Sequence, residues 1–272
     1  MSVLLTGAFG RVGSAFLEHQ TNSFNCTCFD RTTHPEHESI VGDVASYPDF
    51  DEAAEGVDDI IHLAAASRVD ADWPSVLQSN VVGSYNCLEV AKRNGVDSVV
   101  LASTNHVIGM SEQERAPELY SLDYDWTADR STQVRPDSLY GSSKVFLEGM
   151  GRYYVENFES PERVYVLRIG SVRGPSEDHP YADAERDVSE GVYDRESEAY
   201  RQAVRRMKST WQSRRDIASM IAACLNDDTV EYDIFYGVSD NDRRWMDIEH
   251  AKTVLGYEPV DNGDEWAEPP TA

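Results

Sequence analysis

The fold is decided near the N-terminus by one stretch, Val3-Leu4-Leu5-Thr6-Gly7-Ala8-Phe9-Gly10-Arg11-Val12-Gly13. Its apolar start predicts a strand buried on both faces, and residues 11–20 predict a helix. Between them the glycines follow a GxxGxxG spacing. Glycine permits a tight turn and close approach to a pyrophosphate, and the helix N-terminus offers free N–H groups to it. We therefore expect Gly7, Gly10, Arg11, Val12 and Gly13 to bind a dinucleotide.

Strands and helices alternate through the first 170 residues. Further strands are predicted at 25–29, 59–63, 98–102 and 164–169, and long helices at 73–94 and 139–158. This order predicts an α/β fold, a Rossmann-type doubly wound parallel sheet. We expect residues 1–170 to form the dinucleotide-binding core. Residues 171–272 should supply a small C-terminal substrate lobe and the last elements of the same domain.

Three segments break this rhythm. Residues 110–137 read as a long acidic loop, and residues 175–208 as a charged segment that ends in a helix over 195–208. Each is either a binding loop or solvated surface. The last residues, 266–272, are expected to be frayed.

Charge and composition exclude several classes of protein. The net charge of −25 argues against nucleic acid and anionic membranes as partners. Only four Lys accompany twenty Arg and 49 acidic residues, a balance that resembles proteins of salt-accumulating halophiles. The chain has neither an apolar run that could span a membrane nor a basic start typical of a signal peptide. We therefore expect a cytoplasmic protein.

An acidic residue directly after the second strand bears on the cofactor. Asp30 is placed to bind the adenosine ribose, which favours NAD, whereas Arg31 could hold the 2′-phosphate of NADP, so NADP stays open. In this fold an acid such as Asp43, followed by Val44, commonly bonds the adenine amino group. Asn80, a poor helix former inside a predicted helix, suggests a polar role near the cofactor. The cofactor site is also expected to include Leu63, Ala64, Ala65, Ser103 and Ile169.

A Tyr-x-x-x-Lys pattern opens the second long helix. Tyr140 and Lys144 project on one face, where the ammonium and a bound nicotinamide ring would lower the pKa of the phenol from ~10. Thr104 follows the fourth strand, at the sheet edge where ligands bind, and can bond a substrate oxygen. His106 either contacts substrate or is a satisfied histidine. His34 and His37 lie in a polar loop without a metal-like pattern, so no metal site is expected.

With these residues the chain resembles the extended short-chain dehydrogenase/reductase superfamily over essentially its whole length. Within it the chain is most similar to uronate dehydrogenases and to haloarchaeal glucose-6-phosphate and L-arabinose dehydrogenases. The supporting strings are residues 101–109 (LASTNHVIG), 135–141 (RPDSLYG), 167–171 (LRIGS), 209–211 (STW), 236–242 (YGVSDND) and 254–259 (VLGYEP).

The resemblance implies an NAD(P)-dependent aldose 1-dehydrogenase that oxidises a monosaccharide at C1 to the lactone. It implies Tyr140 as the base, Lys144 as its partner and Thr104 as the hydroxyl residue. Residues expected to bind the sugar are Ser67, Thr104, Asn105, His106, Tyr140, Ser171 and Arg206.

The sugar itself stays open between a uronate, a sugar phosphate and a neutral pentose or hexose. Arg206 matches a family position that holds a uronate carboxylate, and with Arg205 and Lys208 it modestly favours an anionic sugar. The alternatives are a nucleotide-sugar epimerase or dehydratase of the same superfamily and a non-catalytic NAD-binding sensor. A homo-oligomer also remains open.

Overall fold

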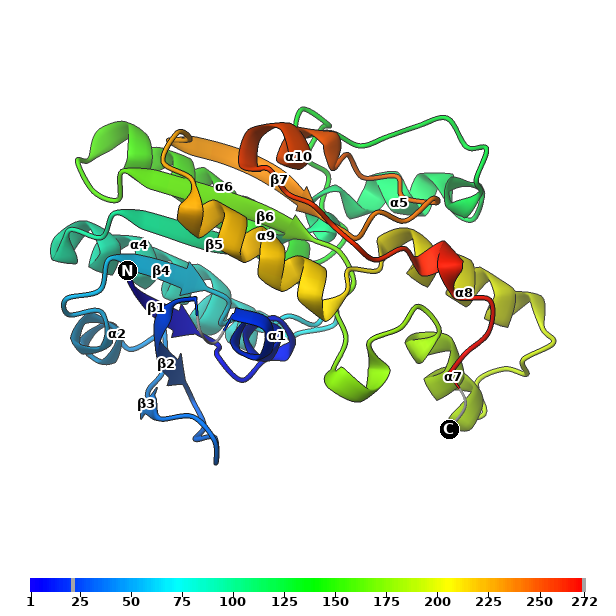
Figure 1. Ribbon diagram of the computed structural model, residues 1–272, viewed down its shortest axis with the longest axis horizontal. Helices are drawn as coiled ribbons and strands as arrows, with labels where there is room; N and C mark the ends of the chain where they lie inside the picture. The colour runs from blue at the N-terminus through cyan, green and yellow to red at the C-terminus, as the bar shows by residue number, and fades with distance from the viewer. Residues whose placement is uncertain (21–22, 271–272) are drawn as a thin grey trace.

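A parallel sheet forms the centre of the computed structural model, which describes residues 1–20 and 23–270 (Figure 1). Within these residues the strands lie in the order β3-β2-β1-β4-β5-β6-β7, and all their pairings are parallel. Their bounds are Ser2–Thr6 (β1), Asn25–Asp30 (β2), Ser39–Val41 (β3), Asp59–His62 (β4), Ser98–Thr104 (β5), Arg163–Ile169 (β6) and Tyr232–Gly237 (β7). The predicted doubly wound α/β fold is confirmed.

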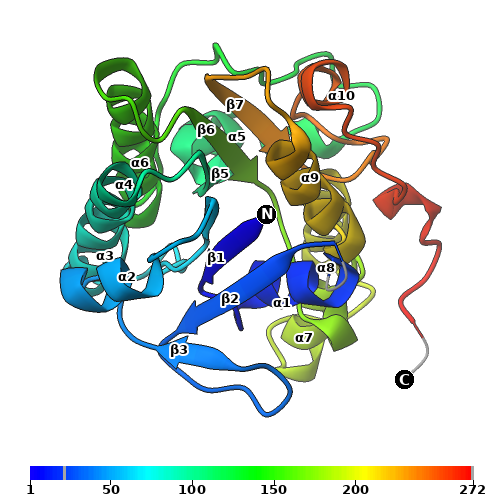
Figure 2. The same cartoon turned by 60° about the vertical axis from the view of Figure 1, so that its left-hand side comes forward.

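Helices cover both faces of the sheet (Figure 2). On one face lie α1 (Arg11–Gln20) and α9 (Arg214–Asn226), and on the other lie α2 (Tyr47–Ala53), α4 (Gly83–Asn94) and α6 (Leu139–Asn157). The remaining helices are α3 (Trp73–Val76), α5 (Gly109–Arg115), α7 (Ala182–Ser189), α8 (Glu198–Thr210) and α10 (Glu249–Leu255). Figure 1 shows α7 and α8 beyond the ends of the strands to which the arrowheads point.

Side-chain alternation along the central strands explains this layering. Val3 and Leu5 of β1 pack with Phe16 of α1, whereas Leu4 between them packs on the opposite face with Leu88 of α4. Each of these side chains is fully buried. Because both faces are covered, a strand that is apolar at every position is the sequence such a sheet requires.

Two predictions about the elements need correction. The helix predicted over 73–94 contains a π-helical stretch, η1 (Leu77–Val82), between α3 and α4. The segment 110–137 is not an unstructured loop, because it includes most of α5 and a short 3₁₀ turn, η3 (Glu118–Tyr120). Leu119 and Tyr120 of that turn are buried in a cluster with Trp245. Apolar side chains inside an acidic segment therefore anchor it to the core.

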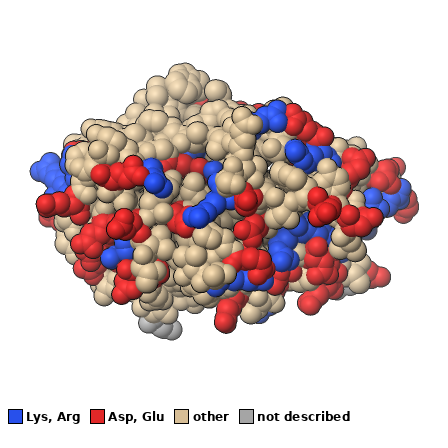
Figure 3. All heavy atoms as spheres, turned by 90° about the horizontal axis from the view of Figure 1, so that it is seen from above, with Lys and Arg blue, Asp and Glu red and all other residues tan. Residues whose placement is uncertain are grey.

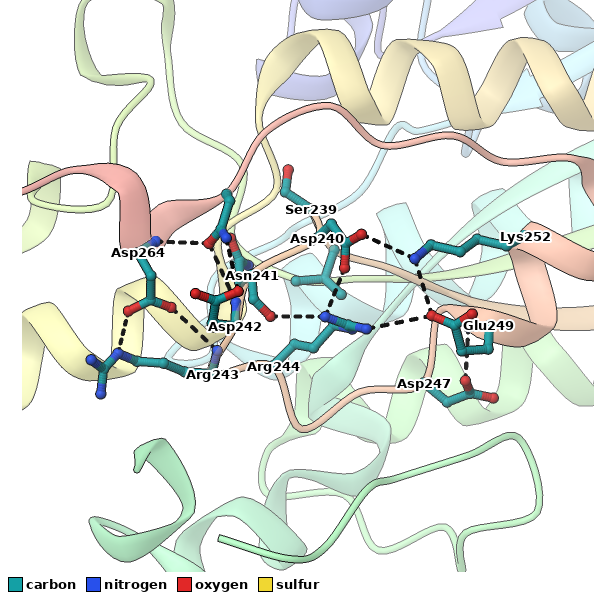
Figure 4. Close-up of polar contacts among 12 residues, drawn as sticks. Ser239, Asp240, Asn241, Asp242, Arg243, Arg244, Asp247, Glu249, Lys252 and Asp264 are labelled. Carbon is teal, nitrogen blue, oxygen red and sulfur yellow. Dashed lines mark hydrogen bonds and ion pairs between the residues drawn. The ribbon is translucent and has the colours of Figure 1, made fainter. Parts of the chain in front are cut away.

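The C-terminal segment is tied to the body of the molecule, so the expected fraying is wrong as far as Trp266. Lys208 of α8 donates to the backbone oxygen of Trp266 at 2.7 Å, and the Trp266 ring lies beside Trp211. The loop after β7 pairs with the same segment through Arg243 and Asp264 (Figure 4). The expectation for residues 271–272 lies outside the described residues.

Acidic side chains are spread over the surface, with basic side chains beside many of them (Figure 3). Figure 4 shows one such group, in which Arg244 and Lys252 each contact both Asp240 and Glu249. An exposed pair of this kind contributes only about 0–1 kcal/mol, so it spreads charge more than it adds stability. Among the described residues, no helix has both the length and the apolar character needed to cross a membrane.

The His62 side chain at the end of β4 is fully buried, and its Nδ1 lies 3.0 Å from Oγ1 of Thr6. Burial, helped by the nearby Lys144 charge, lowers the pKa of His62 from 6.5 to about 3. Below pH 6.5 the unfolded chain binds a proton at this residue that the native protein rejects. Stability is therefore lost as the pH falls from 6.5 towards 3.

We predict that His62 lowers the free energy of unfolding of the wild-type protein by about 2 kcal/mol between pH 7 and pH 5. In His62→Asn this part of the pH dependence should be absent. Urea unfolding at both pH values, in molar KCl, measures this difference even if the variant is less stable at each pH. His19→Asn, at a partly exposed position of α1, should keep the wild-type difference. An unchanged pH dependence in His62→Asn would contradict the assignment.

Candidate active site

A cavity of about 740 Å³ opens at the carboxyl ends of the strands and runs from the β1–α1 turn to α8. It lies where the chain order reverses, between β1 and β4, which is the ligand crevice of open parallel sheets. Its size is in the range of pockets that bind cofactors and small molecules. The cavity is long enough to involve the ends of β1, β2, β4, β5 and β6.

All but one of the predicted site residues line this cavity. They are Gly7, Gly10, Arg11, Val12, Gly13, Asp30, Arg31, Asp43, Val44, Leu63, Ala64, Ala65, Ser67, Ser103, Thr104, Asn105, His106, Tyr140, Lys144, Ile169, Ser171 and Arg206. Phe9, Thr32, Arg68, Ser79 and Arg173 also line it and were not predicted. The exception is Asn80, which is buried beside the cavity.

Two of the three glycines in the β1–α1 turn are required by the packing of the turn itself. Gly7 has a φ of 67°, and a Cβ there would lie 2.7 Å from the backbone nitrogen of Ala64. A Cβ on Gly13 would lie 2.5 Å from the backbone oxygen of Gly7. A side chain at Gly7 would push the turn away from the end of β4, and one at Gly13 would push α1 away from the turn. The glycines thus bring the N-terminus of α1 against the cavity, where its N–H groups can meet an anion.

Asp30 lines the cavity at the end of β2 and also holds the β1–α1 turn in place. Its carboxylate accepts hydrogen bonds from the backbone N–H groups of Phe9, at 3.1 Å, and Thr32, at 3.2 Å. Asp30 therefore caps the turn and also presents its carboxylate at the cavity. Arg31, next to it, forms no ion pair with any of the residues the structure describes.

Tyr140 and Lys144 lie in the first turns of α6, which begins with Ser138 Oγ accepting from the backbone N–H of Gly141. The Lys144 Nζ lies 6.0 Å from the centre of the Tyr140 ring. Gly141 lets α6 pack closely against residue His106, because a Cβ at this position would lie only 2.5 Å from the backbone oxygen of His106. The pattern thus places a phenol and an ammonium at the end of β5.

The expected lowering of the Tyr140 pKa does not occur in the protein by itself. Burial raises the pKa of Tyr140 above 10, and a hydrogen bond to Thr104 offsets this only in part. Burial also lowers the pKa of Lys144 to about 8, against the attraction of Glu148. The same low-dielectric surroundings thus disfavour the charged forms of both groups, the phenolate of Tyr140 and the ammonium of Lys144.

A buried ion pair below these residues was not predicted. Glu148 accepts from Ser103 Oγ at 2.6 Å and from Arg168 Nε at 2.9 Å, and Arg168 also bonds the Tyr236 hydroxyl at 3.0 Å. Breaking such a pair is strongly destabilising because it leaves a buried charge unpaired. Its sequence signal was the spacing of Tyr140, Lys144 and Glu148 at successive fourth positions of one helix face.

Asn80 lies in the π-helical stretch η1 and joins two walls of the cavity. Its Oδ1 accepts from the backbone N–H of Ala66 at 2.7 Å, and its Nδ2 donates to the Ala66 oxygen and to Ser143 Oγ. Asn80 thus contacts Ser143, which directly precedes Lys144, and holds the loop after β4 against α6. It does not itself line the cavity, so its polar role near the cofactor stays a prediction.

The end of the cavity near α8 carries the predicted sugar-binding residues. Thr104 Oγ1 accepts from the backbone N–H of His106 at 3.3 Å, and His106 Nδ1 lies 2.8 Å from a carboxylate oxygen of Asp137. Ser171 Oγ lies 3.0 Å from Thr210 Oγ1. Hydroxyl, amide and imidazole groups thus converge there, as recognition of a polyhydroxylated ligand requires.

The predicted basic cluster on α8 does not assemble around the cavity. Only Arg206 lines it, and this side chain is paired with Glu112 of α5. Arg205 is exposed beside Glu198, and Lys208 points to Trp266. Successive residues of a helix face different directions, so the cluster in the sequence is no cluster in space. The three basic residues therefore do not support an anionic sugar as substrate.

Comparison with known proteins agrees with this geometry. Residues 3–217 match the NAD dependent epimerase/dehydratase family. The chain is 34% identical to an NAD-dependent glucose-6-phosphate dehydrogenase of Haloferax volcanii, over 97% of this chain and 95% of that protein. It is 33% identical to an L-arabinose 1-dehydrogenase (NAD(P)(+)) of the same organism, over 96% of each.

A solved structure shares the fold along the whole chain. It is a variant of the uronate dehydrogenase from Agrobacterium tumefaciens complexed with NAD, with a TM-score of 0.75 and 26% identity over 99% of this chain and 91% of that one.

We predict that Asn80→Ala lowers the free energy of unfolding by about 2 kcal/mol, because Ala66 and Ser143 lose their partners. It should also weaken NAD binding several-fold by loosening the loop after β4. Asn94→Ala is a matched control, since Asn94 makes two side-chain hydrogen bonds in α4 outside the cavity lining. Calorimetric titration with NAD and urea unfolding compare the two variants. Equal NAD affinity in both would contradict the role of Asn80.

Proposed function

The chain belongs to the NAD dependent epimerase/dehydratase family, and we propose that it is an NAD-dependent aldose 1-dehydrogenase. It would oxidise the C1 hydroxyl of a monosaccharide to the lactone. The observation that carries the proposal is that Thr104, Tyr140 and Lys144 line the same cavity as the glycine turn of β1–α1. Full-length similarity to sugar 1-dehydrogenases supports it.

In this proposal each residue has a separate task at the sugar. Tyr140 takes the proton of the C1 hydroxyl, and Thr104 donates a hydrogen bond to the same oxygen as it becomes a carbonyl. A bound NAD would supply the acceptor for the hydride that leaves C1. Lys144 holds the cofactor ribose, and its positive charge favours the phenolate form of Tyr140. Asn105, His106 and Ser171 orient the remaining hydroxyl groups, with Ser67 at the opposite wall.

The residues of the cofactor end fit NAD. Asp30 lines the cavity with a carboxylate that would accept from ribose hydroxyls and repel a 2′-phosphate. Arg31, without an ion pair among the described residues, is the group that would allow NADP as a second cofactor. We propose NAD as the preferred cofactor and the cytoplasm as the place of action, since the cofactor is available there.

Adaptation to concentrated salt is part of the proposal. A net charge of −25 destabilises a folded chain by self-repulsion at low ionic strength, and molar salt screens it within a few Å. The similarity to two enzymes of Haloferax volcanii supports this assignment. Activity is therefore best measured in molar KCl.

We predict that Tyr140→Phe lowers kcat by about 10²–10⁴-fold, since a proton-transfer group is lost, while the Kd for NAD changes little. Tyr153→Phe removes the same hydroxyl from an exposed position of α6 and should keep wild-type activity. Absorbance of the reduced cofactor measures turnover, and calorimetry measures NAD binding. Wild-type turnover in Tyr140→Phe would contradict the assignment of Tyr140 as the base.

We also predict that the purified protein reduces NAD with at least one aldose in molar KCl. The panel contains L-arabinose, D-xylose, glucose, galactose, glucuronate, galacturonate and glucose 6-phosphate, each with NAD and with NADP. If the protein binds NAD but reduces it with none of these sugars, the proposed function is wrong. Stabilisation of the protein by a nucleoside diphosphate sugar would then point to an epimerase.

A further inference from the structure

Glu112 is a buried carboxylate of α5 that faces the sugar end of the cavity through its partners. Its Oε1 accepts from Arg206 Nε at 2.7 Å and from the Tyr120 hydroxyl at 2.8 Å. Its Oε2 accepts from Arg206 Nη2 at 3.3 Å and from Asn105 Nδ2 at 3.5 Å. Glu112 is only 5% exposed, so water does not compete strongly for these bonds.

This arrangement occupies one edge of the Arg206 guanidinium and balances its charge. A guanidinium binds a carboxylate or phosphate through two parallel N–H groups, and here Nε and Nη2 form such a fork with Glu112. Arg206 lines the cavity, where the N–H groups outside this fork can meet a ligand. Because Glu112 already neutralises the cation, these N–H groups suit a hydroxyl oxygen better than a second anion.

Two further arginines that line the cavity are also paired with carboxylates. Arg173 binds Asp183 through two nitrogens, and Arg68 binds Asp70. His106 Nδ1 lies 2.8 Å from a carboxylate oxygen of Asp137. Together with Glu112, these acids come from four different segments of the chain, so the pairing is not confined to one element.

The cofactor end of the same cavity is different. Arg11 and Arg31 line it, and neither forms an ion pair with a residue that the structure describes. Arginine charge is thus left unpaired where phosphates of a dinucleotide are expected, whereas Arg206 and Arg173 are paired where the sugar is expected. The protein has a net charge of −25, so carboxylates are abundant. Within the described part of this cavity they pair with Arg206 and Arg173 but not with Arg11 or Arg31.

We propose that Glu112 selects the substrate class, by neutralising Arg206 so that the site takes an uncharged aldose in preference to a uronate or a sugar phosphate. The proposal rests on the proposed function and narrows its substrate. A carboxylate or phosphate at Arg206 would place a second negative charge beside the buried Glu112 carboxylate, and this like-charge repulsion disfavours an anionic sugar. Glu112 acts through Arg206 and Asn105, so it is a positioning residue.

The test compares sugars that differ only at C6: galactose with galacturonate, and glucose with glucuronate and glucose 6-phosphate. Wild-type protein should have the higher kcat/KM for the neutral sugar of each set. Glu112→Gln keeps the size of the side chain and removes its charge, which frees Arg206. It should shift the ratio of kcat/KM for the anionic to the neutral sugar by on the order of tenfold or more towards the anion.

Glu114→Gln is the matched control. Glu114 lies two residues away on α5, pairs with Arg135 at the surface, and does not line the cavity. The substitution makes the same change in net charge and should leave the ratio unchanged. Equal shifts in both variants would mean that overall charge sets the ratio, and would overturn the role of Glu112.

Higher kcat/KM for the anionic sugars in the wild-type protein would overturn the proposal while supporting the proposed function. This result needs no variant, so the proposal stays testable even if Glu112→Gln does not fold. Absence of turnover with every sugar would overturn the proposed function instead. In that case calorimetric binding of galactose and galacturonate to the wild-type protein decides alone: preference for galactose supports the proposal, and preference for galacturonate overturns it.

Discussion

The close approach of the β1–α1 turn to β4 is the constraint on which the site depends. At Gly7 a Cβ would lie 2.7 Å from the Ala64 nitrogen, so only glycine allows the two strand ends to lie this close. The contact sets the position of the α1 N-terminus and of the loop after β4. Asn80 then joins that loop to α6 through Ala66 and Ser143. The glycine after β1 thus helps to set the position of the helix that carries Tyr140 and Lys144.

Below the cavity, Glu148 and Arg168 form an ion pair that is almost fully buried. Ser103 donates a further hydrogen bond to Glu148, and Arg168 donates one to the Tyr236 hydroxyl. Such a network adds little net stability compared with apolar residues, because desolvation offsets the attraction. Its value lies in geometry, since it fixes the end of β5, where Thr104 follows Ser103, against the face of α6 that carries Lys144.

Acidic residues have two physical roles in this protein. Many lie at the surface, where exposed ion pairs add little stability and salt screens the excess charge. A few reach the wall of the cavity and pair with its cations, as Glu112 does with Arg206. The distribution separates a cationic cofactor end from a charge-balanced sugar end. In an enzyme of this composition, selectivity for substrate charge therefore depends on which carboxylates are buried, not on how many there are.

The sequence by itself determined the features that depend on local spacing. The glycine turn after an apolar strand, the alternation of strands and helices and the Tyr140–Lys144 spacing predicted the fold, because neighbours in sequence are neighbours in a turn or on one helix face. Together with the family resemblance they predicted site residues that all line the cavity except Asn80, but they missed others of the lining such as Phe9 and Arg173. The half-buried edge strand β7 escaped prediction, since Tyr232 and Asp233 break its apolar pattern. Only the tertiary structure decided the partners of the charged groups. Glu112 and Arg206 are 94 residues apart in the chain, and a pair at that distance leaves no periodic signal. Whether Arg206 meets its ligand as a free cation or as a neutralised one thus depends on how α5 packs against α8.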